Sequence, residues 1–182
     1  MNRITIPAAE LTPVASRPLL EAVNKQLGVV PNLMKVLSNS PAALGGYLSL
    51  NSAIGKGALG AKTGERIALA IAEINRCGYC LAAHTYLGKN VAKLDDAEIA
   101  ANRGGTSTDL KADAAVRFAA KVAQARGHVS DDDVQIVKGA GYSDAEVMEI
   151  VVHVALNTLT NYVNEVAQTE IDFPAVELLR AA

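Results

Sequence analysis

Hydrophobic residues recur along this chain at the spacing of a helix rather than at that of a strand. Ile67, Ala70, Ile71 and Ile74 follow the i, i+3, i+4, i+7 order that gives a helix one buried face. No segment sustains an alternation of apolar and polar residues, and Ala, Leu, Glu and Lys are frequent almost everywhere. The pattern therefore predicts an all-α fold.

Capping residues, prolines and glycines indicate where the predicted helices begin and end. Thr63 is interpreted as a helix N-cap, Gly88 as a helix end, and Asp95 with Glu98 as a capping box. Residues 55–60 and 104–108 are expected to be loops. We expect helices over residues 17–27, 32–37, 41–54, 63–74, 80–87, 109–126 and 144–169, short ones after Asp95 and Ser130, and a short helical tail after Pro174.

Composition narrows the class of protein. Of the 182 residues, half are hydrophobic and one fifth are charged, which is typical of a single globular domain spanning residues 1–182. A chain of this length can hold a core without a disulfide or a metal. The formal charge of −2, with five Tyr, two Phe and no Trp, offers neither a basic field nor a stacking platform. Nucleic acid is therefore not an expected partner.

No segment is apolar enough to suggest a membrane partner. The most apolar stretch, residues 147–159, contains Glu149, His153 and Asn157, which excludes a transmembrane helix. The first residues, MNRITIPAAELTP, lack the long apolar core of a secretory signal. The sequence therefore predicts a cytoplasmic protein.

The candidate chemistry lies in Cys77 and Cys80, the only two cysteines, which form a CxxC pair. Near the start of a predicted helix the two thiols face the same way, and unpaired backbone N–H groups there lower the pKa of a thiol. His84 follows Cys80 by one helical turn and is placed to take its proton, directly or through a water. Glu65, on the preceding helix, orients that imidazole if the two helices pack antiparallel. Together they form an activated nucleophile, a resolving thiol and a proton relay.

These residues resemble a known family. The run from Glu65 to His84, E-(11 residues)-C-G-Y-C-(3 residues)-H, is similar to the active-site signature of the AhpD-like alkylhydroperoxidases, within the carboxymuconolactone decarboxylase superfamily. The later run NYVNEVAQTEIDFP is similar to the tail of peroxidase-related members. The resemblance covers most of the chain and is strongest over residues 63–88.

The resemblance implies an AhpD-like helical fold, assembly as a homotrimer or hexamer, and a thiol-dependent peroxidase activity. Cys80 is then the peroxidatic thiol, Cys77 the resolving thiol, and Glu65 with His84 the proton relay. The substrate is a hydroperoxide, an organic one given the apolar surroundings. The reductant is a thiol that the sequence does not identify; the best-known member uses a lipoylated carrier. No bound cofactor is needed.

Two features bear on which branch the resemblance favours. Tyr79 stands where AhpD proper has a second histidine, which is a departure from the full relay. The decarboxylase branch generally lacks the CxxC pair, so Cys77 and Cys80 disfavour decarboxylation of a muconolactone.

Other interpretations of the cysteine pair stay open. Cys77, Cys80 and His84 supply three metal ligands at helical spacing, whereas a structural zinc site needs four. The two thiols are alternatively inert core residues. In other classes of protein, the chain is a non-enzymatic redox sensor whose disulfide switches an interface, or a small-molecule-binding helical oligomer. If the thiols are catalytic, we expect them at a helix start in a pocket partly open to solvent, and two thiols sealed in apolar packing would refute the catalytic hypothesis.

Several polar residues near the signature also have two interpretations. Glu73 either assists the relay or forms a salt bridge with Arg66 or Arg76. The Tyr79 side chain either packs or lines the peroxide pocket. Three amides lie near one face of the last long helix, where they are either solvated, or buried at a subunit interface or at the active site: Asn157, Asn161 and Asn164.

Overall fold

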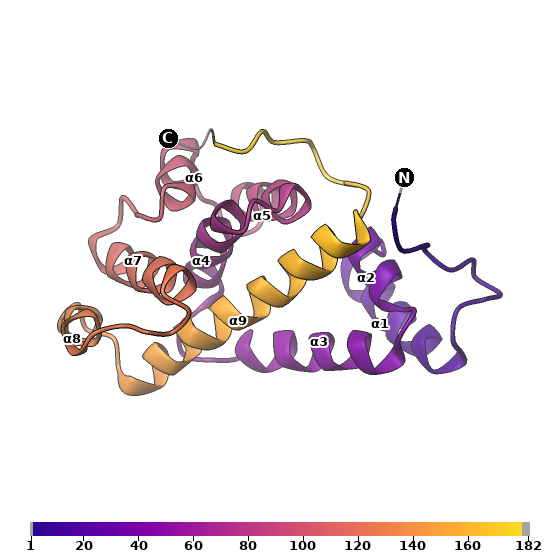
Figure 1. The fold of residues 1–182 in the computed structure, drawn as a ribbon, viewed down its shortest axis with the longest axis horizontal. Helices are drawn as coiled ribbons and strands as arrows, with labels where there is room; N and C mark the ends of the chain where they lie inside the picture. Colours follow the sequence, from indigo (N-terminus) through magenta and orange to yellow (C-terminus); the bar gives the residue numbers. More distant parts are fainter. Residues whose placement is uncertain (1, 180–182) are drawn as a thin grey trace.

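The computed structural model describes residues 2–179, and every regular element among them is a helix (Figure 1). Helices expected at 17–27, 32–37 and 41–54 are confirmed with the same bounds. In chain order the elements are the 3-10 helix η1 (Val14–Ser16) and the α-helices α1 (Arg17–Leu27), α2 (Asn32–Leu37), α3 (Pro41–Ile54), α4 (Ala61–Ile74), α5 (Gly78–Asn90), α6 (Asp96–Arg103), α7 (Leu110–Gln124), α8 (Asp131–Gly139) and α9 (Asp144–Ala167).

Helix α4 is the centre of the molecule and contacts α5, α6, α7 and α9. The expected single buried face is wrong, because every residue from Arg66 to Ala72 is buried. Leu69 belongs to an apolar cluster that includes both cysteines, whereas Ile67 and Ile71 belong to a second cluster with α7, α8 and α9. Packing on both sides of α4 therefore overrides the amphipathic pattern.

Two predicted helix ends differ from the structure. The N-cap of α4 is Gly60, not Thr63, and its φ of 81° lies in the left-handed region that favours glycine. Gly88 does not end α5, which continues to Asn90. A Cβ at Gly88 would approach Leu94 Cδ1 to 3.3 Å, so this glycine permits close packing rather than termination.

Two helices begin with a complete capping box, whereas the box predicted at Asp95 and Glu98 is incomplete. Ser143 and Glu146 form one complete box at α9, and Ser130 and Asp133 form the other at α8. Asp95 accepts from the backbone N–H of Glu98, but Glu98 does not return the bond. Its carboxylate turns inward instead, toward a buried partner on α4.

The helical tail expected after Pro174 is absent from the described residues. Helix α9 ends at Ala167, with Gln168 in the left-handed conformation, and residues 168–179 form a strap without helix. The strap runs back from the end of α9 past α5 toward α6 (Figure 1). Leu179 donates its backbone N–H to Glu73 Oε1 at 2.6 Å, and Arg103 donates to the Glu177 carbonyl at 2.6 Å. These tertiary bonds take the place of local helical ones.

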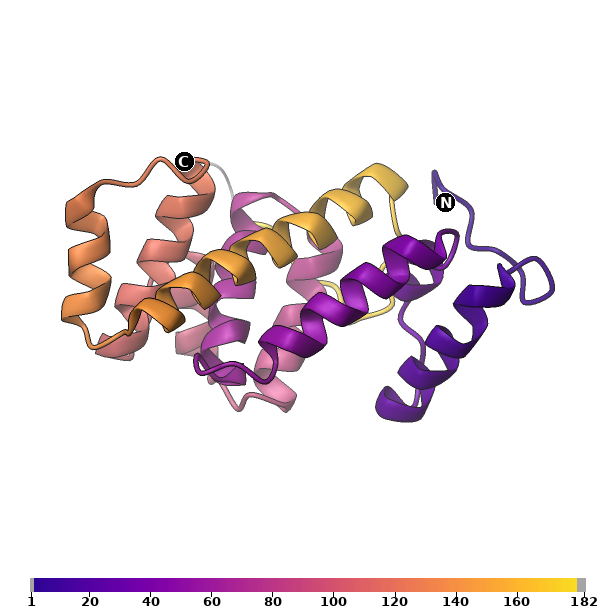
Figure 2. The ribbon, with the colours of Figure 1, turned by 90° about the horizontal axis from the view of Figure 1, so that it is seen from below.

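Helices α3 and α9 lie side by side along one side of the molecule (Figure 2). Helix α9 also contacts α2 and α5, so a single long helix reaches both the thiol turn and the far apolar cluster. Within residues 2–179, no helix has the length and apolarity that crossing a membrane requires.

Candidate active site

The turn between α4 and α5 carries both cysteines. Arg76 adopts a positive φ of 54°, and Cys77 is the extended N-cap residue of α5. The Cys77 backbone N–H donates to the Ala72 carbonyl at 2.9 Å, and its Sγ accepts from the Cys80 backbone N–H at 3.4 Å. Both thiols therefore lie in the first turn of a helix, where the sequence placed them.

His84 and Glu65 meet across the α4–α5 pair. His84 lies one turn beyond Cys80, and its Nδ1 is 2.9 Å from Glu65 Oε2. An ionised carboxylate only accepts, so Nδ1 carries the proton of this bond and Nε2 is left to exchange one. Both side chains are about one fifth exposed, at 20% and 23%, so the pair connects the buried thiols with solvent.

The two thiols differ strongly in acidity. A hydrogen bond from the Cys77 thiol lowers the pKa of Cys80 to about 6, against the effect of burial and with help from the His84 charge and two asparagine amides. That same bond, together with burial and the negative charge on Cys80, raises the pKa of Cys77. The thiolate therefore lies on Cys80 and the shared proton on Cys77.

The neighbours of the His84 imidazole favour its charged form. Burial alone lowers its pKa, but the charge of Glu65, its hydrogen bond and the Cys80 thiolate together raise the pKa above the usual value. A protonated His84 beside a Cys80 thiolate is an arrangement able to donate a proton to a leaving group.

The asparagines of α9 are buried, which settles the two interpretations of these amides. Asn164 Nδ2 donates to Cys80 Sγ at 3.2 Å, and Asn161 Oδ1 accepts from Asn75 Nδ2 at 2.9 Å. Asn157 donates to the His153 carbonyl within its own helix. Amides at helical spacing in an otherwise apolar segment were the signal in the sequence for a polar site reached by α9.

Tyr47 is a neighbour of the site that the sequence did not single out. It lies on α3 and packs against the cluster that holds the cysteines. Burial, with the nearby negative charges of Cys80 and Glu65, raises the pKa of Tyr47 to about 12. Its phenol therefore stays protonated, and the contact depends on packing of α3 that no local pattern reveals.

The structure also distinguishes the two interpretations of Tyr79, packing or pocket lining, and those of Glu73, relay or salt bridge. Tyr79 is buried and packs edge-on against Phe173 of the strap, with ring centroids 5.8 Å apart. Its hydroxyl accepts from the Leu33 backbone N–H at 3.2 Å. Glu73 pairs with Arg103 at 2.8 Å, so neither predicted partner, Arg66 or Arg76, is correct.

The expected pocket partly open to solvent is wrong for this structure. Cys77 is 0% exposed and Cys80 is 2% exposed. The strap covers their turn, since Ile171 Cδ1 lies 3.8 Å from the position of a Cβ on Gly78. The surroundings of Cys80 are nevertheless polar, because an amide and a charged imidazole face it. The thiols are therefore covered, but not sealed in apolar packing.

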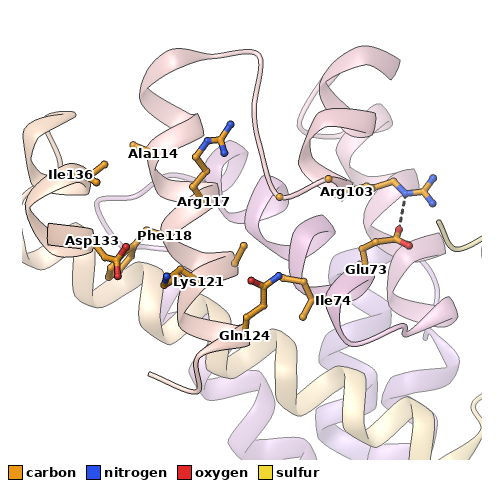
Figure 3. A pocket seen from close by; sticks show the side chains of 13 residues that line it. Glu73, Ile74, Arg103, Ala114, Arg117, Phe118, Lys121, Gln124, Asp133 and Ile136 are labelled. Carbon is orange, nitrogen blue, oxygen red and sulfur yellow. Dashed lines mark hydrogen bonds and ion pairs between the residues drawn. The ribbon is translucent and has the colours of Figure 1, made fainter. Parts of the chain in front are cut away.

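A cavity of about 500 Å³ lies elsewhere, between the ends of α4 and α6 and the helices α7 and α8. Figure 3 shows Lys121 and Gln124 at its centre, with the Glu73–Arg103 pair at one side. None of the four predicted site residues lines it. Across residues 2–179, His, Cys, Asp and Glu side chains form no group of three or more that could hold a metal ion.

A central helix followed by a helix with a dithiol first turn, plus a Glu–His pair, defines the class as an all-helical dithiol domain. Residues 41–125 match the carboxymuconolactone decarboxylase family. The matched segment contains all four predicted site residues, and the solved structures described next share the fold of the whole chain.

Three solved structures share the fold. The AhpD core of an uncharacterized peroxidase-related protein from Ralstonia eutropha JMP134 has a TM-score of 0.84 at 21% identity, covering 94% of this chain and 92% of that one. A peroxidase-related protein from Silicibacter sp. TM1040 has a TM-score of 0.80 at 21% identity, covering 92% and 89%. The debrominase Bmp8 has a TM-score of 0.75 at 19% identity, covering 93% and 92%. Among curated proteins, none matches the chain.

Proposed function

We propose that this protein is a thiol-dependent peroxidase that reduces organic hydroperoxides. The observation that carries the proposal is the geometry of the thiol turn: Asn164 Nδ2 donates to Cys80 Sγ at 3.2 Å, and the Cys80 backbone N–H donates to Cys77 Sγ at 3.4 Å. The surroundings lower the pKa of Cys80 and raise the pKa of Cys77. His84 is bonded to Glu65, and its neighbours Glu65 and Cys80 raise its pKa and so favour its charged form. This is the arrangement that peroxide reduction by a dithiol needs.

The chemistry proceeds in two steps. The Cys80 thiolate attacks the terminal oxygen of the hydroperoxide, so an S–O bond forms, the O–O bond breaks, and the alkoxide takes a proton from His84. Cys77 then attacks the Cys80 sulfenic acid, which gives a disulfide and water. A dithiol reductant returns two electrons and two protons. Glu65 holds the imidazole so that Nε2 carries these protons.

A single-turnover thiol count tests the proposal. The reduced protein, freed of reductant, receives one equivalent of cumene hydroperoxide, and the remaining thiols are titrated. We expect rapid loss of both thiols in the wild type, no reaction in Cys80→Ser, and a trapped sulfenic acid in Cys77→Ser. His84→Ala should react slowly. Thiols that stay reduced in the folded wild type, yet titrate fully after denaturation, would refute the peroxidase.

Turnover separates the enzyme from the alternatives. With dihydrolipoamide as the recycling dithiol, a peroxidase consumes many equivalents of hydroperoxide. A redox sensor forms its disulfide once without turnover, and a small-molecule-binding oligomer does neither. Because a debrominase shares the fold, 2,3,4-tribromopyrrole, which is bound in a structure of one of its variants, is the further substrate to compare.

We also propose that the protein works as a homo-oligomer, a trimer or a hexamer, in the cytoplasm. A dithiol that must be re-reduced fits a reducing compartment. Along α9, solvent-facing positions follow the alternating steps of four and three residues that mark a coiled-coil seam. Light scattering on the wild type and on Tyr162→Asp tests whether copies of the chain associate through these residues: Met148, Val152, Ala155, Leu159, Tyr162 and Val166.

A further inference from the structure

We propose that Asn161 and Asn164 form an amide cradle that holds the negative charge of the Cys80 sulfur and then the oxygen added to it. This assignment rests on the proposed peroxidase for its second half only. The first half concerns the thiolate, which exists before any peroxide is added. Both residues come from α9, far from the thiol turn in the sequence.

Asn164 makes the direct contact. Its Nδ2 donates to Cys80 Sγ at 3.2 Å, and the side chain is 2% exposed, so no bulk water competes for this bond. Its Oδ1 has no hydrogen-bond partner among residues 2–179. A buried amide oxygen left unpaired costs free energy, and a functional role of the group is one of the reasons such a cost persists in a protein. Here the other end faces a thiolate.

Asn161 is oriented by a second amide. Its Oδ1 accepts from Asn75 Nδ2 at 2.9 Å, which directs its own Nδ2 away from Asn75. Asn161 is 0% exposed, and its Nδ2 completes no hydrogen bond within residues 2–179. The same amide nevertheless lies near enough to Cys80 to help lower the pKa of that thiol. A buried donor thus stands beside the sulfur without an acceptor.

Peroxide attack would supply that acceptor. When the Cys80 sulfur takes the terminal oxygen, the O–O electron pair leaves with the alkoxide, which becomes an alcohol after protonation. The new oxygen on sulfur is an acceptor, and the free N–H of Asn161 is a donor for it. Asn164 keeps its contact with the sulfur. The site therefore gains a hydrogen bond as the reaction proceeds, in the manner of an oxyanion hole.

Asn157 provides a matched control in the same helix. It is buried like the other two, but its amide already bonds to the His153 carbonyl one turn back. Asn157→Leu removes the same chemical group from the same apolar surroundings without touching a thiol. The titratable groups that interact with Cys80 are identical in all the variants: Cys77, His84, Tyr47 and Tyr79. Glu65 and Glu165, which act on Tyr47 and Cys77, are unchanged as well.

The experiment follows the ultraviolet absorbance of the Cys80 thiolate against pH in the reduced protein. We expect Asn164→Leu to raise the Cys80 pKa by about one unit, a tenfold change in its acid dissociation constant. Asn164→Asp keeps the shape but replaces the donor with an acceptor-only carboxylate, so it should raise the pKa of Cys80 further. Asn157→Leu should leave that pKa unchanged. An Asn164→Asp protein that folds and titrates like the wild type would overturn the cradle. The Asp variant also decides the matter if the Leu variant fails to fold.

A second measurement addresses the oxygen. In the Cys77→Ser background, sulfenic acid formation is timed after adding cumene hydroperoxide, with and without Asn161→Leu. Slower formation, at a pH where both proteins carry the full thiolate, supports the role of Asn161, and equal rates refute it. If the parent protein fails to react with peroxide while Asn164→Leu still shifts the thiolate titration, the peroxidase is wrong and the thiolate cradle stands.

Discussion

Two polar clusters begin at adjacent residues of α4, Arg66 and Glu65, and they are built differently. Arg66 reaches Glu98 on α6, with Nε 2.7 Å from Oε1, whereas Glu65 reaches His84 beside the thiols. The Glu98 carboxylate also accepts from the Asn102 amide, from both hydroxyls of the loop at Ser107 and Thr108, and from the Thr108 backbone. Donors surround both of its oxygens.

The thiol cluster is incomplete by comparison. Asn161 Nδ2 and Asn164 Oδ1 have no partner within residues 2–179, and the His84 ring has a nitrogen free for proton exchange. Beside the Glu98 carboxylate an acceptor, Asn102 Oδ1, lacks a partner among residues 2–179, whereas the thiol cluster also has an unpaired donor, Asn161 Nδ2, which can bind a new acceptor. The difference indicates that Glu98 supports the fold, whereas Glu65 is the carboxylate assigned to the proposed chemistry.

Loss of Glu98 should have the largest effect on stability. Glu98→Ala leaves the Arg66 guanidinium buried without its partner and frees the loop at 106–108, so we expect a loss of about 3–5 kcal/mol in the free energy of unfolding. Urea unfolding measures it, and the thiolate titration of any folded fraction should be unchanged. A loss below about 1 kcal/mol, the size of an exposed pair, would contradict the structural role.

The same cluster predicts the acid limit of the fold. Burial opposes ionisation of Glu98, but bonds from Ser107, Thr108 and Asn102 outweigh it and lower its pKa to about 2. A carboxyl with a lowered folded pKa stabilises the fold fully above its usual value and loses that stabilisation as the pH falls toward 2. The wild type should therefore lose stability steeply in this window, and Glu98→Gln should show a flatter dependence in urea unfolding at a series of pH values.

Loss of Glu65 should change proton affinity more than stability. The charge and hydrogen bond of Glu65 raise the pKa of His84, so Glu65→Gln should lower that pKa and shift peroxide reactivity to lower pH. The pair stabilises the fold below the usual His pKa, and that stabilisation fades as the pH rises through the raised value; being partly exposed, it is worth below about 1 kcal/mol. Proton NMR of the His84 ring measures the shift, with the exposed His128 as an internal reference. An unchanged His84 titration would show that Glu65 does not control the imidazole.

The sequence predicted the site residues that lie on one helix or on two neighbouring helices, but not those that come from distant helices. Cys77, Cys80 and His84 share one helix, so their spacing alone sets their geometry, and Glu65 needed only antiparallel packing of two neighbouring helices. The amide that contacts Cys80 and the phenol of Tyr47 come from distant helices. Their positions depend on how α3 and α9 pack on the turn, which no local pattern encodes.

The predictions of thiols partly open to solvent and of a helical C-terminal tail were wrong for a related reason. The residues after Pro174 have helix-forming composition, but the Glu177 carbonyl accepts from Arg103 and the Leu179 N–H donates to Glu73, instead of bonding to residues one helical turn away. Propensity is a weak preference, and tertiary bonds override it. The resulting strap covers the turn that a free helical tail would have left open.

A change in the strap should have the smallest effect, and it separates the access of a reagent to the thiols from the acidity of Cys80. Phe173 packs on Tyr79 and on Tyr86, with ring centroids 5.8 and 6.0 Å apart, so Phe173→Ala should loosen the cover over the thiols. Alkylation of Cys80 by iodoacetamide should become several-fold faster, while its pKa stays unchanged because no partner of the sulfur is altered.

Glu177→Ala is the control, since that exposed residue holds the strap through its backbone. A rate that rises equally in both variants would mean that general loosening, rather than the Phe173 contact, limits access. A rate unchanged in Phe173→Ala would mean that reagents reach the thiolate by another route, past the partly exposed His84–Glu65 pair.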